Sequence, residues 1–314
     1  MLAGILYLAA GLGLLAVRVI RKGLRQETAE AALTAGDYPW LATVVIVGGM
    51  IGPLLLMFGL SRTTAGQASL LLNLEGLATM SIAWLVFREN VDRRLLTGAA
   101  AILAGATVLA WDGTGLGFDV GSLLIAGACV AWGIDNNLTR KISSAAPVQI
   151  AMFKGLFAGG INLALAFSLG ATVPSLGLLA AGGVVGFFGI GVSLVMFMLG
   201  LRHLGTARTG AYFSLAPFIG ALLAIVLLQE PVTAGLLIAG ALMAIGLAIH
   251  LAERHEHEHV HEELEHDHLH AHDEHHTHSH GSEVTEPHSH RHRHGPLRHK
   301  HPHYPDLHHR HGHG

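Results

Sequence analysis

Four side chains that can carry chemistry lie inside otherwise apolar stretches of this chain. Glu75 lies in LLLNLEGLATM, Asp135 and Asn136 lie in WGIDNNLTRK, and Lys154 follows in a third apolar stretch. A carboxyl group in a low-dielectric medium can become neutral by taking up a proton or by pairing with a cation. These residue types predict a site that binds ions or solutes, and no catalytic constellation or nucleotide-binding loop accompanies them.

Glu75 lies near the middle of a run long enough to cross a bilayer. A charge at that depth costs at least about 2.5 kcal/mol, so the side chain must face a cavity, pair or become neutral. One reading makes Glu75 the coupling site of a proton-driven antiporter, and the other makes it a neutral packing residue. Asn73 is a further candidate, but it lies about 200° away around a regular helix and cannot share the face of Glu75.

Asp135 has two readings. It can be a second carboxylate on a translocation path, with Asn136 beside it, or it can form a structural pair with Lys154 in the next helix. Lys154 taken alone favours a simpler reading, in which its long side chain extends to the membrane surface.

The elements that position these residues are long apolar runs, which favour an all-α polytopic membrane protein. Mean hydropathy is +0.48 over the whole chain, although a charged tail lowers that value. We predict nine helices, at 2–20, 40–60, 64–87, 95–111, 120–138, 148–169, 176–200, 208–228 and 233–251.

Basic residues alternate between the joints of these helices. The first, third, fifth and seventh joints hold eleven Lys and Arg residues in total, and the even joints hold only Arg62. Cytoplasmic joints of membrane proteins are enriched in Lys and Arg. We therefore expect the odd joints and the C-terminal tail to be cytoplasmic, in a bacterial inner (plasma) membrane.

An internal repeat relates two parts of the chain at an offset of 141 residues. Residues 58–91 align without gaps to 199–232, so that Glu89 meets Glu230. The second unit shows five helices and the first shows four, because the partner of helix 120–138 would lie before Met1. We infer a ten-helix plan of two inverted five-helix units whose first helix is missing here, through a misassigned start or true loss. Inverted repeats are typical of secondary transporters.

Prolines and glycines predict how the helices bend and pack. Pro53 and Pro217 each remove a backbone donor, and Pro217 aligns with Gly76, so we expect both units to be weakened at the same depth. The small-residue stretches 155–159 and 182–191 predict close helix contacts.

The paired helix ends LVFRENV and LLQEPV, with GLRHLGTARTGAYFSLAPFIGALLA and ACVAWGIDNNLTRKIS, resemble the EamA-like branch of the drug/metabolite transporter superfamily. The resemblance implies two EamA-like repeats, at 1–111 and 119–251, and transport of small solutes by alternating access. It also identifies Glu89 and Glu230 as helix-end glutamates. It does not imply a particular substrate.

Residues 252–314 form a His-rich tail that lacks an apolar face, so we expect it to be disordered and cytoplasmic. Its His-x-His steps suit loose, multi-site binding of Zn, Ni or Co. The ligands expected there are His255, His257, His259, His261, His266, His268, His270, His272, His275, His276, His278 and His280.

The sequence thus predicts a non-enzymatic secondary transporter, an exporter of a small metabolite or drug-like solute. The first alternative is a divalent-metal efflux protein that uses the tail, and the second is a membrane metal sensor without transport. The expected partners are the lipid bilayer and the solute, without nucleic acid or a required cofactor. The sequence leaves a homodimer open.

Overall fold

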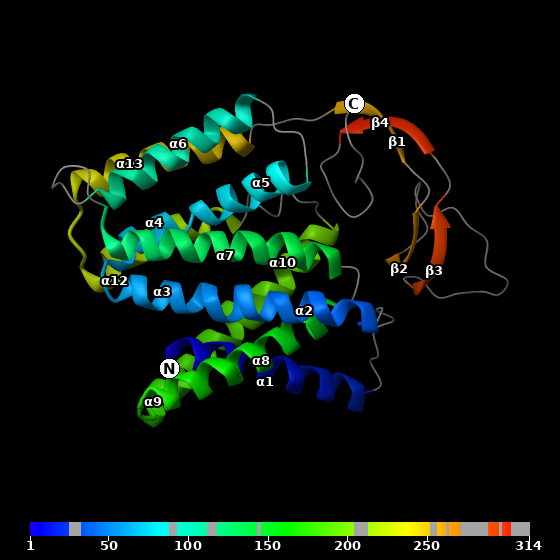
Figure 1. Cartoon of the computed structure of the whole chain (residues 1–314), viewed down its shortest axis with the longest axis horizontal. Coiled ribbons are helices and arrows are strands. Elements are labelled where there is room, and N and C mark those ends of the chain that lie inside the picture. The colour runs from blue at the N-terminus through cyan, green and yellow to red at the C-terminus, as the bar shows by residue number, and fades with distance from the viewer. Residues whose placement is uncertain are drawn as a thin grey trace.

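The computed structural model describes residues 1–24, 33–87, 93–111, 118–142, 146–203 and 213–251, with four strand segments in the tail. The described helices form nine rods, as the sequence predicts, where a rod is one helix or several consecutive helices that continue one another (Figure 1). Four rods are single helices of the first and middle parts of the chain: α1 Leu2–Gly23, α6 Arg93–Ala110, α7 Val120–Ile142 and α8 Pro147–Ser168.

The other rods are divided or shorter. The second consists of a 3₁₀ turn Ala35–Asp37, α2 Tyr38–Val44, a π-helical segment Val45–Ile51 and α3 Gly52–Leu60. The third consists of α4 Ala65–Leu71 and α5 Leu74–Phe87. The seventh consists of α9 Leu176–Val185, a π-helical segment Gly186–Val192 and α10 Ser193–His203. The last two are α12 Ala216–Leu228 and α13 Ala234–Leu251.

The irregular segments follow the offset of the internal repeat. The π-helical segments begin at residues 45 and 186 and end at 51 and 192, and both pairs are 141 residues apart. The third rod is broken at 72–73, and a turn at 214–215 precedes α12. These breaks agree with the prediction that both units are weakened at one depth. The inverted equivalence of the two units stays a prediction that these positions support.

Glycines bring the helices into close contact. A Cβ added to Gly11 or Gly155 would collide with the backbone of the other helix, where α1 crosses α8. Gly98 and Gly246 face each other in the same way between α6 and α13. A Cβ on Gly186 would likewise collide with the backbone of Leu6, so the small-residue stretches of α8 and of the rod containing α9 serve packing, as predicted. Apolar side chains such as Leu222 are widely exposed on the outside, which suits contact with lipid.

Seven of the described helices are long and apolar enough to cross a membrane. Helix ends with basic residues gather on one side of the bundle: α1 ends with a pair at 21–22, and α6 begins with a pair at 93–94 (Figure 1). His250 near the end of α13 contacts the carbonyl oxygen of Leu95 at 3.0 Å, so the tail follows from this side. We call it the basic side. On the opposite side, α4, α7 and α13 begin.

The described residues of the tail form short strand segments. They are strands β1 Glu256–His261, β2 Leu264–His270, β3 His288–His294 and β4 Leu297–Pro302. β1 pairs with β4 and β2 with β3, both antiparallel. The alternation of His with other residues permits this extended form. An isolated two-stranded ladder is only marginally stable in water, so these strands add little to the fold.

Candidate functional site

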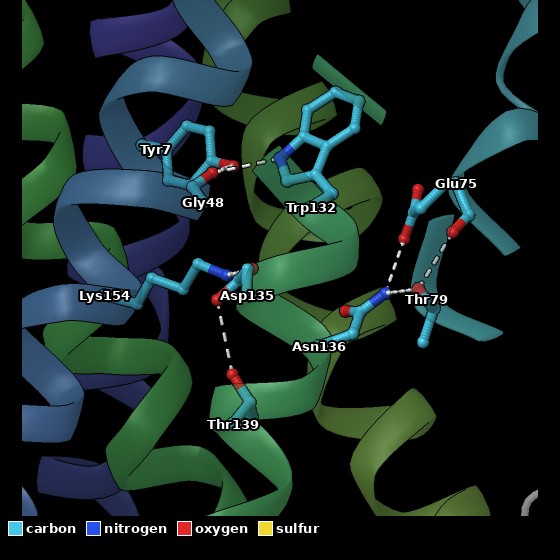
Figure 2. Close-up of polar contacts among 9 residues, drawn as sticks. All are labelled: Tyr7, Gly48, Glu75, Thr79, Trp132, Asp135, Asn136, Thr139 and Lys154. Carbon is cyan, nitrogen blue, oxygen red and sulfur yellow. Dashed lines mark hydrogen bonds and ion pairs between the residues drawn. The ribbon is translucent and has the colours of Figure 1, made fainter. Parts of the chain in front are cut away.

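The polar site consists of the buried side chains around Asp135 and Asn136 of α7. These two successive residues face different neighbouring helices. Asp135 faces α8, where Lys154 forms an ion pair with its Oδ2 atom (Figure 2). Thr139, one turn further along α7, donates to Asp135 Oδ1 at 3.3 Å. The side chains of Lys154 and Asp135 are only 7% and 5% exposed. The structure therefore forms the pair that the sequence offered as an alternative, and Lys154 does not extend to the membrane surface.

Asn136 faces the other way, toward α5. Its Nδ2 atom donates to Glu75 Oε1 at 2.9 Å and lies 3.2 Å from Thr79 Oγ1. Thr79 donates to the carbonyl oxygen of Glu75 at 2.8 Å, one helical turn away (Figure 2). Asn137 supports this contact by donating to the Thr79 carbonyl oxygen at 3.0 Å. Glu75 and Asn136, both predicted site residues, are thus brought together across two helices.

A backbone carbonyl of the π-helical segment 45–51 completes the site. Gly48 O accepts hydrogen bonds from Trp132 Nε1 at 3.0 Å and from Tyr7 OH at 3.2 Å (Figure 2). A Cβ at Gly48 would collide with the Asp135 carboxyl group, so only glycine permits this approach. Single π-helical turns occur frequently at functional sites. Sequence reasoning missed Tyr7 and Trp132, and their only signal was an aromatic residue within an apolar helix.

Asn162 on α8 contacts the same segment. Its Nδ2 atom donates to Gly49 O at 2.8 Å, and its buried Oδ1 atom has no hydrogen-bond partner among the described residues.

The remaining predicted residues lie elsewhere. Asn73 lies at the break of the third rod, where Nδ2 donates to Leu70 O at 2.9 Å and contacts Met243 Sδ at 3.8 Å. It does not join the contacts of Glu75. Glu230 follows α12 at the opposite side of the molecule, and Glu89 lies outside the described residues.

No group of three or more His, Cys, Asp and Glu side chains is placed to hold a metal ion within the part of the chain that the structure describes. The side chains of the His-rich tail lie outside that part, so metal binding by the tail stays a prediction.

The chemistry of the site follows from its charges. Lys154 neutralises Asp135, which reduces the cost of holding either charge at this depth. Glu75 has the neutral amide of Asn136 as its partner, and no described Lys or Arg forms an ion pair with it. A carboxylate inside a membrane requires neutralisation, so Glu75 can accept a proton or a cationic group.

Known proteins resemble this chain over most or part of its length. An uncharacterized transporter from Methanothermobacter thermautotrophicus is 30% identical over 260 residues, which cover 77% of this chain and 75% of the relative. A probable 4-amino-4-deoxy-L-arabinose-phosphoundecaprenol flippase subunit ArnE from Pseudomonas paraeruginosa is 36% identical over 104 residues. Those residues cover 32% of this chain and 88% of the subunit.

A solved crystal structure shares the fold, with a TM-score of 0.58 over 79% of this chain and 86% of the other, at 19% identity. The profile of the EamA-like transporter family matches residues 1–111 and 119–252, nearly all of the helical part. This match and the archaeal relative agree with the resemblance found in the sequence. The chain belongs to the EamA-like transporter family.

Proposed function

We propose that this transporter is a secondary active exporter that moves a small metabolite or drug-like solute by alternating access. The observation that carries the proposal is the environment of Glu75, a carboxyl group in the middle of a membrane rod whose described side-chain partner is neutral. Lys154, the nearby cation, is already paired with Asp135. Glu75 is therefore available to a proton or to cargo.

Competition for one carboxylate couples two movements. When a proton and a solute cannot both be bound at Glu75, release of one permits binding of the other. A ligand shifts a conformational equilibrium only by its differential affinity for the two states. Proton binding at Glu75 supplies such a difference if the carboxyl group faces different sides in the two states.

The irregular helices support this cycle. The third rod is broken at 72–73, two residues before Glu75, and a second break at 214–215 precedes α12. Transporter folds built from inverted repeats use discontinuous helices near the bilayer midplane. We also propose that the basic side faces the cytoplasm of a bacterial inner membrane, because Lys and Arg favour cytoplasmic joints.

The test uses purified protein in proteoliposomes with an imposed pH gradient. Candidate solutes are screened by their ability to dissipate the gradient, and Glu75→Gln is compared with the parent. We expect Glu75→Gln to reduce solute-driven proton movement to the level of protein-free vesicles. Asp119→Asn is the matched control, since Asp119 lies outside the site, where it caps α7 by accepting from Ser122 N at 2.7 Å. Unchanged flux with unchanged pH dependence in Glu75→Gln would reject the coupling role.

A lipid-linked solute is a second candidate cargo. The similar ArnE subunit is named as part of a flippase for a phosphoundecaprenol-linked sugar. This chain has an apolar groove whose lining includes Ile5 and Leu12 of α1, Phe167 of α8 and Leu179 of α9. Such a surface suits a hydrocarbon chain. Movement of a fluorescent prenyl-phosphate lipid between leaflets, measured by quenching from one side, would distinguish this cargo from a free solute.

A further inference from the structure

Glu230 makes a contact that the transport site does not use. The residue follows the end of α12, and its two carboxylate oxygens accept hydrogen bonds from Ala65 N at 2.7 Å and Gly66 N at 2.8 Å. These two amides begin α4, which lies 164 to 165 residues away in the sequence. The helix-end glutamate identified by family resemblance therefore binds the start of a different helix.

Local geometry explains why a glutamate suits this position. The first amides of a helix lack partners within the helix, and the positive end of the helix dipole favours a negative group. Thr64 satisfies a further amide by accepting from Gln67 N at 3.3 Å. Gln229 adopts a left-handed conformation with φ of 55°, which ends α12 and turns the chain toward α4. The start of α4 is thus capped by its own Thr64 and by Glu230.

The contact joins the two repeat units on the opposite side of the molecule. α4 belongs to the first unit and α12 to the second, and at the 141-residue offset α12 corresponds to α5, the second half of the rod that α4 begins. Ser69 Oγ donates to Pro217 O at 2.8 Å, one helical turn deeper along the same interface. Beyond the break at 72–73 the rod continues as α5, whose Glu75 accepts a hydrogen bond from Asn136 of α7. These hydrogen bonds connect α4 to α12 and to the residue that follows it, across the boundary between the two units.

We propose that Glu230 is a latch that holds the opposite side of the transporter closed. Opening that side separates α4 from α12, which removes the carboxylate from both amides and leaves them unpaired. The latch rests on the alternating-access cycle proposed above, and it assigns Glu230 to the balance between states rather than to solute binding.

Asp119 provides a matched comparison. Its carboxylate also caps a helix start on this side, but it accepts from Ser122 N only three residues away. Loss of this cap weakens one helix and leaves the interface between the units intact. Glu230→Gln and Asp119→Asn therefore separate a latch from a cap.

The test measures access to the interface without any substrate. Cys129 is replaced by alanine, and Ala224, which is 4% exposed and packs near Gly66, is replaced by cysteine as the reporter. The protein is placed in lipid nanodiscs, where both sides are open to solvent, and the alkylation rate by a charged maleimide is followed. We expect Glu230→Gln to raise the rate about tenfold, the effect of losing one charge-assisted hydrogen bond. Asp119→Asn should label at the parent rate.

Equal rates for Glu230→Gln and the parent would overturn the latch, as would an equal increase in Asp119→Asn. Glu230→Asp retains the charge on a shorter side chain, and its rate should lie between those of the parent and Glu230→Gln. A folded fraction from size-exclusion chromatography accompanies each rate, and an unfolded Glu230→Gln leaves Glu230→Asp to decide. Faster labelling in a protein that moves no solute would support the latch and reject the proposed transport.

Discussion

At the scale of single residues, the site separates two carboxyl groups by their partners. Asp135 has a cation, Lys154, and Glu75 has an amide, Asn136. The neighbouring positions of Asp135 and Asn136 on α7 direct one side chain to α8 and the other to α5. Asp135 is therefore paired with a cation, whereas the described side-chain partner of Glu75 is neutral, and the proposed exchange of proton and solute rests on this difference.

The ion pair leads to a prediction about stability. Lys154→Ala leaves the buried Asp135 carboxylate without its cation, which should lower the free energy of unfolding by about 3–5 kcal/mol. The double variant Asp135→Asn/Lys154→Met removes both charges and should recover most of that loss. Denaturant titration in mixed micelles measures all three proteins. A double variant no more stable than Lys154→Ala would show that the charges do not stabilise each other.

At the scale of elements, the π-helical segment 45–51 packs closely against α7. A Cβ on Gly48 would collide with the carboxyl group of Asp135 on α7. For its repeat counterpart, Gly189, Val185 of the same rod is the only neighbour among the described residues within 4 Å of such a Cβ. The same glycine in the two units therefore has different surroundings.

We predict that Gly48→Ala lowers the free energy of unfolding by about 1–3 kcal/mol, the usual cost of overpacking. Gly189→Ala should be neutral or stabilise by up to about 1 kcal/mol, because alanine is the better helix former. Unfolding in mixed micelles compares the two variants with the parent. An equal loss in both would mean that loss of glycine itself, and not the contact with Asp135, sets the cost.

Sequence reasoning reached the rods because hydropathy is a local property, and it expected weakened helices near Gly76 and Pro217, a few residues from the observed breaks at 72–73 and 214–215. It also offered the pairing of Asp135 with Lys154, since a short joint connects their helices. It did not reach the contacts of Tyr7 and Trp132 with Gly48 O, which bring three helices to one carbonyl oxygen. Those contacts depend on the π-helical turn, and no periodicity in an apolar run distinguishes that turn from a regular helix.

At the scale of the whole molecule, a compact helical part is joined to a tail of different composition. Cores of buried side chains, including Leu71 and Met243, lie in the helical part. The described strands of the tail form two separate two-stranded ladders. The described strands of the tail pair with one another, so we expect the tail to add little to the stability of the helical part. Metal binding by its His residues stays a prediction.

We predict that a chain ending at Ala252 keeps the fold, with its unfolding temperature shifted by less than about 2 °C. It should lose most of the Zn binding that calorimetry detects in the full chain, because the expected His ligands follow Ala252.

Zn, Ni and Co flux in proteoliposomes is then measured for both chains. Metal flux in the full chain that disappears on truncation would favour metal efflux supplied by the tail. Flux of equal size in both would place a metal path among the helices, and Glu75→Gln in the truncated chain would test whether its carboxylate lines that path.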